Sequence, residues 1–545
     1  MASLTIPTGD TTYTEKVQAV KIRLESSIPA SLRLSSSILA DFPLDVTGIP
    51  QLCGLLTSSE LAITELDATT VCKRIAEGNL SAVEVVTAFG KRAAVAHQLT
   101  QCLTDYFLDE GIAQAQELDE YYKREGKVIG PLHGLPVSIK DHMPIKGRWG
   151  SGGFLSNLEL SKEDCDMTAI LRQLGAVFYV KTNQPQGIFA LESTSFYGRT
   201  LNPHNLHLTP GGSSGGEGAL IAMKGSCIGV GSDVGGSIRA PSAHCGIYGI
   251  CPTALTMPTH DYIWYQNGQD GVHLSTGPMC RSAQDMATFL QALASTEPHL
   301  LDPKLIPLSF DLPDLSQRKL RVGIMTHDQT VVPHPPTSRA LQLAREKLSA
   351  APNLEVVDYQ AYDHAVGYAL AHEMYMEDGG KTFRRMLKEG GEDILPLGGW
   401  VTGLQPIKDH DAIEMWQLHD KRDSFRRAYS DYWNKIGCDV VLCPPFAGTA
   451  SRHDTAKYWS YTAIWNLLDY PGAVFPTGLK VDPAIDEVPP SYAALGDKDL
   501  ENYKLYADDP SVFKGAPISL QLVAKRFNDG LLLAALNVIE GIVKG

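Results

Sequence analysis

Long hydrophobic runs are missing from this sequence of 545 residues. The longest apolar stretch, residues 531–543, is short and is interrupted by Asn537 and Glu540, so it predicts a buried helix instead of a membrane span. The N-terminal residues Met-Ala-Ser-Leu-Thr-Ile-Pro lack the charged and then apolar pattern of a secretory leader. Both absences favour a cytoplasmic protein that does not cross a membrane.

Cysteine pairs of the metal-binding or redox-active kind are also missing. The 10 cysteines are scattered, and none belongs to a C-x-x-C pair. In a large chain without a leader, reduced and buried thiols are the better interpretation than disulfides. His204 and His207 lie near each other, but Pro203 precedes the first and no third ligand is close in the sequence. We therefore expect no metal site.

Dense clusters of positive charge are absent as well. The chain has 47 Lys and Arg residues against 62 Asp and Glu residues, which gives a net charge of −15. This balance disfavours nucleic acid or an anionic membrane surface as a partner. The apolar fraction of 43% is that of an ordinary globular protein and permits a substantial core.

The sequence shows no internal repeat, and nothing in residues 67–545 has the composition of a flexible linker. One large domain is therefore favoured over two. Residues 1–60 are polar and mixed, and Pro29, Pro43 and Pro50 are expected to break any long element there. We predict an N-terminal extension, residues 1–60, which packs on a main domain, residues 61–545.

Helical and strand patterns alternate along the main domain. Ser81 and Glu84 form a capping box at the start of a predicted helix. A short strand is predicted to end at Lys140, and Asp166 is predicted to cap a helix that runs to Leu174. Further strands are expected at residues 176–180, 320–325, 354–359, 440–442, 473–475 and 518–523, with a helix around 338–349. The alternation predicts an α/β fold with helices on both faces of the sheet.

Two serine-bearing, glycine-rich stretches lie close together, at residues 211–216 and 231–239. Glycine costs backbone entropy, so such a density requires a backbone that approaches another group closely or adopts dihedrals that side chains forbid. Ser213 and Ser237 lie in these stretches, where backbone N–H groups can converge on a reacting oxygen. That arrangement is typical of acyl-transfer chemistry.

Two other interpretations of the first stretch fit less well. A phosphate-binding P-loop requires Lys and then Ser or Thr after its last glycine, whereas Glu217 follows Gly216 and a carboxylate repels phosphate. The stretch 211–215 also matches the G-x-S-x-G elbow of α/β-hydrolases. That elbow needs an apolar strand directly before it, and residues 205–210, which end in Pro210, form a poor strand.

The stretches that contain both serines and an upstream lysine resemble those of the amidase signature family. The matching stretches are Thr-Pro-Gly-Gly-Ser-Ser-Gly-Gly-Glu-Gly-Ala at 209–219, Ser-Asp-Val-Gly-Gly-Ser-Ile-Arg-Ala-Pro-Ser at 232–242, Cys-Gly-Ile-Tyr-Gly at 245–249 and Gly-Pro-Leu-His-Gly-Leu-Pro-Val-Ser-Ile-Lys-Asp at 130–141. The resemblance covers residues 57–540 and is strongest to fungal acetamidases and general amidases, relatives of fatty acid amide hydrolase. It implies a single large domain built on a central mixed β-sheet with helices on both faces.

The resemblance also implies roles for particular residues. Ser237 corresponds to the nucleophile, Ser213 to a bridging serine at a cis peptide bond after Gly212, and Lys140 to the base. The other implied positions are an oxyanion hole formed by the backbone N–H groups of Val234, Gly235, Gly236 and Ser237, supporting residues Ser214, Asp233 and Arg239, an acyl-site residue Ile188, and pocket neighbours Phe189 and Glu192. No metal or organic cofactor is implied.

A lysine accepts a proton only when it is neutral, so the pKa of Lys140 must fall well below its ordinary value near 10.4. Desolvation is the available cause, because the apolar run 135–139 can carry the side chain into the interior. The expected activity is hydrolysis of a small-molecule carboxylic amide through an acyl-enzyme.

Several related functions stay open at this point. The amide can be small, or it can carry a fatty or aryl-acetic group, depending on the length of the pocket. A catalytic subunit of a glutamine-dependent amidotransferase is another alternative, since that class shares the triad but works with partner chains. Relatives commonly pair, so the resemblance also implies a homodimer.

Overall fold

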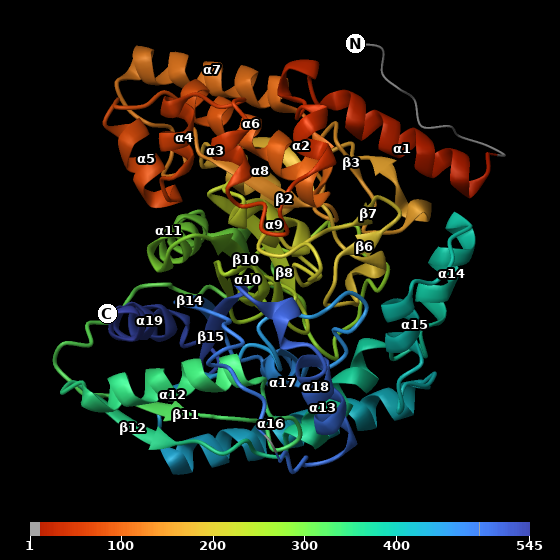
Figure 1. Cartoon of the computed structure of the whole chain (residues 1–545), viewed down its shortest axis with the longest axis vertical. Coiled ribbons are helices and arrows are strands. Elements are labelled where there is room, and N and C mark those ends of the chain that lie inside the picture. Colours follow the sequence, from red (N-terminus) through yellow and green to blue (C-terminus); the bar gives the residue numbers. More distant parts are fainter. Residues whose placement is uncertain (1–10, 490) are drawn as a thin grey trace.

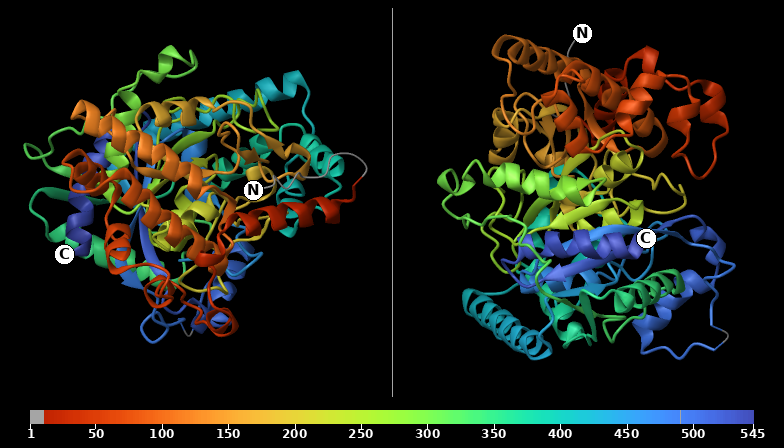
Figure 2. Two further views of the ribbon diagram at one scale, coloured as in Figure 1. Left: turned by 90° about the horizontal axis from the view of Figure 1, so that it is seen from above. Right: turned by 90° about the vertical axis from the view of Figure 1, so that its left-hand side faces the viewer.

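The computed structural model describes residues 11–489 and 491–545, and its centre is an eleven-stranded sheet. The strand order is β1-β5-β2-β8-β10-β9-β14-β15-β13-β11-β12. The sheet is mixed, because β2 runs parallel to both β5 and β8, and β11 to both β12 and β13, whereas the other neighbours are antiparallel. Helices pack on both faces of this sheet (Figures 1 and 2). The predicted α/β class is therefore confirmed.

The strands of the large sheet are β1 (Leu103–Tyr106), β2 (Pro136–Lys140), β5 (Val177–Thr182), β8 (Ile228–Asp233), β9 (Tyr248–Cys251), β10 (Ser275–Cys280), β11 (Leu320–Ile324), β12 (Leu354–Asp358), β13 (Val440–Cys443), β14 (Gly472–Lys480) and β15 (Pro517–Ala524). Two short hairpins pair β3 (Trp149–Gly150) with β4 (Glu159–Leu160) and β6 (Thr194–Ser195) with β7 (Gly198–Arg199).

The α-helices of the described residues are α1 (Tyr13–Ser27), α2 (Ser36–Ala40), α3 (Ile49–Leu52), α4 (Ser58–Thr64), α5 (Ala68–Ala76), α6 (Ala82–Thr100), α7 (Leu108–Glu125), α8 (Asp166–Gln173), α9 (Gly215–Ala222), α10 (Arg239–Cys245), α11 (Ala283–Ala294), α12 (Pro335–Ala350), α13 (His364–Tyr375), α14 (Lys381–Gly390), α15 (Pro396–Thr402), α16 (Ala412–Ile436), α17 (Ser460–Leu468), α18 (Asp497–Ala507) and α19 (Asp529–Lys544). Among them, no helix is both long and apolar enough to cross a bilayer.

Most predicted elements are present with shifted ends. The capping box of Ser81 and Glu84 begins α6. Asp166, however, does not cap α8, because Cys165 is the N-cap and makes no side-chain hydrogen bond, while Asp166 is the first helical residue. The strand expected at 176–180 is β5, which begins one residue later because the Ala176 amide still donates to Leu171 O at the end of α8.

The N-terminal segment differs from the expectation. Prolines were expected to break any long element, yet α1 has 15 residues and ends before Pro29. A capping box between Thr12 and Glu15 begins it. Its Arg23 donates to Asp105 Oδ1 at 2.7 Å, which ties the helix to β1. Residues 1–10 lie outside the described part of the chain, and the domain boundary at residue 60 stays a prediction.

The parallel pairing of β2 with β8 brings the motif residues together. Val137 lies opposite Ile228 and Ile139 lies opposite Val230. The carboxyl ends of parallel strands meet at one edge of a sheet, so Lys140 and Asp233, which end these two strands, reach the same edge. The glycine-rich loops lead into α9 and α10 there.

Candidate active site

The candidate base lies at the end of a buried strand. Lys140 is the last residue of β2 and is 0% exposed. Its Nζ atom donates hydrogen bonds to Ser213 Oγ at 2.7 Å and to Ser232 Oγ at 3.0 Å. Burial lowers the pKa of Lys140 to about 7, although nearby carboxylates, Asp233 first, act in the opposite direction. A large fraction of this amine is therefore neutral near pH 7, as the sequence predicted.

The candidate bridging serine is held in a rigid loop. The peptide bond between Gly212 and Ser213 is cis, as expected. The hydroxyl of Ser193 donates to Ser213 O at 3.1 Å and accepts from the Gly215 amide at 2.9 Å. Because Ser213 is itself fully buried, its hydroxyl faces Lys140 from a fixed backbone.

The candidate nucleophile lies in the turn between β8 and α10. Ser237 is 2% exposed, and its carbonyl accepts a hydrogen bond from the Ser214 amide at 3.0 Å. Ser214 Oγ in turn donates to Ser232 O at 3.3 Å. These bonds connect the two glycine-rich loops through Ser214. Among the described residues, the Ser237 hydroxyl makes no hydrogen bond, so the structure places Ser213 and Ser237 in joined loops without a direct bond between their hydroxyls.

A buried ion pair holds this turn. The Asp233 carboxylate accepts from the amides of Gly236 at 2.8 Å and Ile238 at 3.0 Å, and from the Arg239 guanidinium at 2.9 and 3.0 Å. Burial alone would raise the pKa of Asp233, but the charge of Arg239 and these donors outweigh it and lower the pKa to about 2. The turn is thus fixed around a permanent carboxylate, to which Asn466 also donates at 2.9 Å.

The amides of the turn are not equivalent. The Gly236 amide donates to Asp233, so in this arrangement it does not face a substrate oxygen. Among the described residues, the amides of Gly235 and Ser237 have no hydrogen-bond acceptor. The carbonyls of Val234 and Gly235 accept from Tyr375 Oη at 2.9 Å and Thr462 Oγ1 at 2.8 Å. Sequence analysis missed both of these hydroxyls.

The segment expected to line the acyl site has a strained backbone. Ile188 is buried and has a φ of 60°, which is uncommon for a β-branched residue. The ring of Phe189 packs against Tyr375, with centroids 5.5 Å apart. Glu192 lines a small cavity, but its carboxylate also accepts from the amides of residues 454–456 at 2.8–3.0 Å. Glu192 therefore organises a loop as well as shaping a pocket.

A second buried carboxyl lies close to the candidate base. Glu217 accepts hydrogen bonds from the hydroxyls of Ser138 and Thr182, the latter at 2.8 Å. Burial raises the pKa of Glu217 to about 7, and the ionised form in turn raises the pKa of Lys140. The sequence contained this residue in its motif, but nothing in the pattern showed that its charge acts on the lysine.

Replacing this carboxyl tests the coupling. We expect Glu217→Gln to shift the acidic limb of the pH profile of kcat/KM to lower pH, because the Lys140 ammonium loses a stabilising negative charge. Glu192→Gln is the matched control, since Glu192 is also a buried carboxyl with a raised pKa but bonds to backbone amides. A limb that moves to higher pH, or that moves equally in both variants, contradicts the coupling.

One of the two neighbouring histidines has a backbone partner. His204 Nε2 lies 3.0 Å from Cys245 O. In the described part of the chain, one group of metal-ligating side chains comes within ligand spacing, Asp166, His260 and Asp261, and two of its members are exposed. None of these belongs to the two glycine-rich loops.

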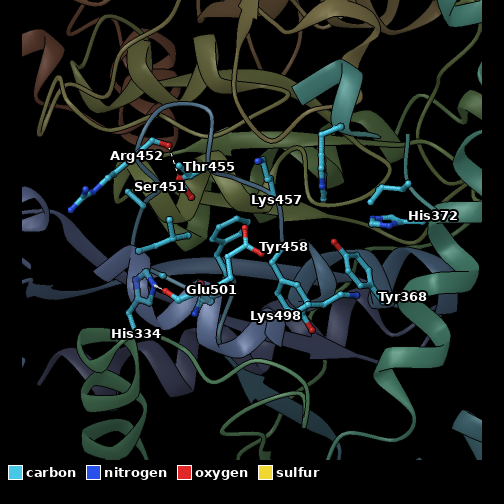
Figure 3. A pocket seen from close by; sticks show the side chains of 18 of the residues that line it. His334, Tyr368, His372, Ser451, Arg452, Thr455, Lys457, Tyr458, Lys498 and Glu501 are labelled. Atoms are coloured by element: carbon cyan, nitrogen blue, oxygen red, sulfur yellow. Dashed lines mark hydrogen bonds between the residues drawn. The ribbon is translucent and has the colours of Figure 1, made fainter. Parts of the chain in front are cut away.

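A cavity of about 370 Å³ is lined partly by residues of α13, the helix that ends in Tyr375, and Lys140, Ser213 and Ser237 are not among its lining residues. Figure 3 shows Tyr368 and His372 of α13 on one of its walls. The Tyr368 hydroxyl accepts from the Trp459 amide at 2.7 Å, and the His372 ring lies 6.1 Å from that of Tyr375. The lining of the cavity is thus connected to the Val234–Gly235 peptide through Tyr375.

Comparisons with known proteins place this chain in a family. A family model described as Amidase matches residues 84–533. A candidate amidase of Schizosaccharomyces pombe is 42% identical over 95% of this chain and 97% of that protein. An acetamidase of Aspergillus oryzae is 36% identical over 94% of this chain and 96% of that protein. Among solved structures, a fatty acid amide hydrolase matches with a TM-score of 0.92 at 36% identity, and the match covers 98% of this chain and 96% of that one.

Proposed function

This chain belongs to the amidase family and is an amide hydrolase, and we propose that it acts through Ser237, Ser213 and Lys140 by way of an acyl-enzyme. The observation that carries the proposal is the 2.7 Å contact between Lys140 Nζ and Ser213 Oγ in a fully buried site, across which the neutral amine can accept the Ser213 proton. The pKa of about 7 that burial gives the lysine supports the same assignment. A neutral amine in contact with a hydroxyl is the requirement of a general base.

The acylation half begins with two proton transfers. Neutral Lys140 takes the proton of Ser213 Oγ while Ser213 takes the proton of Ser237 Oγ, and the Ser237 oxygen attacks the amide carbonyl carbon. The carbonyl oxygen becomes an oxyanion. Protonated Lys140 then returns the proton through Ser213 to the amide nitrogen, the C–N bond breaks, and the amine or ammonia leaves.

The deacylation half repeats the same relay with water. Lys140, neutral again, takes a proton from water through Ser213 as the water oxygen attacks the acyl carbon. The C–O bond to Ser237 then breaks, Ser237 regains its proton, and a carboxylic acid is released. Each cycle consumes one water and requires no added oxidant, reductant or cofactor.

Backbone amides are the proposed stabilisers of the oxyanion. We assign this role to Val234, Gly235 and Ser237, and the free amides of the last two support the assignment. Gly236 keeps a positioning role, because Asp233 holds its amide. Removing one donor of such a hole typically costs about 10²–10³ in kcat.

A common acyl-enzyme can be tested by partitioning. Hydrolysis of an amide and an ester with the same acyl group, in the presence of hydroxylamine, is expected to give one ratio of hydroxamate to acid, because both substrates pass through the same Ser237 ester. Different ratios for the two substrates would show that no shared intermediate exists and would contradict the proposal.

Replacing the bridging serine isolates its role in proton transfer. We expect Ser213→Ala to lower kcat by roughly 10²–10⁴-fold with little change in KM, the range for a proton-transfer group. Ser193→Ala is the matched control, because Ser193 contacts this loop from the segment before β6 and bonds only to backbone atoms of the loop. An increase in KM alone would contradict the bridging role.

The size of the substrate is a separate question. A small amide is the first candidate, and the acetamidase relative supports it. A second candidate is an amide with a larger apolar acyl group, which the similarity to a fatty acid amide hydrolase supports. The cavity of about 370 Å³ has the volume for such a group, but Lys140, Ser213 and Ser237 are not among its lining residues. Rates measured across amides from acetamide to long-chain and aryl-acetic amides distinguish the two, since kcat/KM rises along the series only if the site at Ser237 accommodates a large acyl group.

A further inference from the structure

Two hydroxyls from distant segments contact the proposed oxyanion turn. Tyr375, the last residue of α13, is 1% exposed and donates to Val234 O at 2.9 Å. Thr462, in the first turn of α17, is fully buried and donates to Gly235 O at 2.8 Å. Neither residue lies in the glycine-rich stretches, and the two hydroxyls hold two successive peptide groups.

A peptide group is planar, so fixing one end fixes the other. In a trans peptide the C=O of one residue and the N–H of the next point in opposite directions within the same plane. The hydrogen bond from Tyr375 to Val234 O therefore sets the direction of the Gly235 N–H. That amide has no acceptor among the described residues, and it is one of the donors assigned to the oxyanion.

The two glycines of the turn make this contact possible. A Cβ atom on Gly235 would lie 2.8 Å from Tyr375 Oη, and a Cβ atom on Gly236 would lie 2.3 Å from Thr462 Oγ1. Such distances are too short for real Cβ contacts, so side chains there would displace the two hydroxyls. Gly236 also has a φ of 127°, which favours glycine in any case.

Tyr375 is suited to act as a permanent donor. Burial, and after it the charge of Asp233, raises the pKa of its hydroxyl, so the proton stays in place throughout the working range. Its ring is fixed by Phe189 at 5.5 Å and by Trp459 at 6.5 Å between centroids. The hydroxyl therefore has little freedom to leave Val234 O.

We propose that Tyr375 is a positioning residue of the reaction, whose hydroxyl aims the Gly235 N–H at the oxyanion by holding the Val234 carbonyl. Thr462 holds the carbonyl of the next peptide, Gly235 O, and the N–H of that peptide bonds to Asp233 instead of facing the oxyanion. The inference rests on the proposed function, because it assigns Tyr375 a part in stabilising that oxyanion. It explains why a glycine pair separates Val234 from Ser237.

The test removes the hydroxyl and keeps the ring. We expect Tyr375→Phe to lower kcat about tenfold with KM nearly unchanged, less than the loss of a whole oxyanion donor. The affinity for a trifluoromethyl ketone, which forms an oxyanion on a serine, should fall by the same factor. The acidic limb of the pH profile should stay in place, because Lys140 is untouched.

Controls separate this effect from misfolding. Tyr429→Phe is the matched variant, since Tyr429 is also fully buried and its hydroxyl lies 3.0 Å from His364 Nε2, with no bond to the turn. Rates are expressed per site titrated by a fluorophosphonate, so unfolded protein does not count. We expect Tyr429→Phe to match the wild type in kcat and in ketone affinity.

Three results would overturn the inference. Tyr375→Phe could equal the wild type in kcat, or it could raise KM while the ketone affinity stays unchanged, which indicates a packing role only. If the wild-type protein neither reacts with the fluorophosphonate nor binds the ketone, the result contradicts both the proposed function and this inference. Labelling of the wild type therefore distinguishes the two failures.

Discussion

Ser237→Ala is expected to abolish turnover, with kcat lowered by about 10⁶-fold, the order seen when a serine hydrolase loses its nucleophile. The reason is that Ser237 carries the single hydroxyl of residues 234–238, the turn between β8 and α10. Covalent labelling by a fluorophosphonate should disappear in the same variant. Kinetics with an amide substrate and intact-protein mass after labelling measure the two effects.

A matched control shows that the loss is chemical. Ser242→Ala changes a fully buried serine in α10 whose hydroxyl donates to Ile238 O at 2.8 Å. It should keep both turnover and labelling, with at most a modest loss of stability. Full labelling of Ser237→Ala would exclude Ser237 as the nucleophile.

Lys140→Ala is expected to lower kcat at neutral pH by roughly 10²–10⁴-fold, the contribution of a general acid–base group. The sign of the pH effect follows from the lowered pKa. Below about pH 7 the wild-type amine becomes protonated and cannot accept a proton, so activity falls as pH decreases through that value. The variant should lose this limb and retain slow activity that rises with pH, because hydroxide then replaces the base.

Another buried lysine provides the comparison. Lys181 in β5 is 0% exposed, but its Nζ atom donates to Trp149 O at 3.0 Å instead of to a serine. Lys181→Ala should keep the limb near pH 7 in the folded fraction. If Lys140→Ala keeps the wild-type profile, the base is a different group.

Local sequence patterns were enough for the strands and turns that carry the motif. The apolar run before Lys140 predicted both β2 and the burial that lowers the pKa of the lysine. The capping box of Ser81 predicted the start of α6. These features depend on residues a few positions apart, so a short window of sequence contains the necessary information.

Features that depend on distant contacts were not predictable in this way. Tyr375 and Thr462 reach the turn from α13 and α17, and no periodicity indicates such a meeting. By contrast, the start of α1 lies within reach of a short window, because Thr12 and Glu15 form a capping box and the next proline after them, Pro29, comes only after the helix has ended.

Some expectations have not been tested by the structure. The cytoplasmic location, the homodimer and the boundary at residue 60 stay predictions.

The most direct test of the central claim, that neutral Lys140 activates Ser237 through Ser213, is the pH dependence of the rate of inactivation by a fluorophosphonate. Fluoride leaves without needing a proton, so this rate reports activation of the nucleophile alone. We predict a rate that rises about tenfold per pH unit below pH 7 and levels off above it in the wild type, in keeping with the Lys140 pKa of about 7. A rate independent of pH between about 5 and 9, or the same profile in Lys140→Ala, would contradict it.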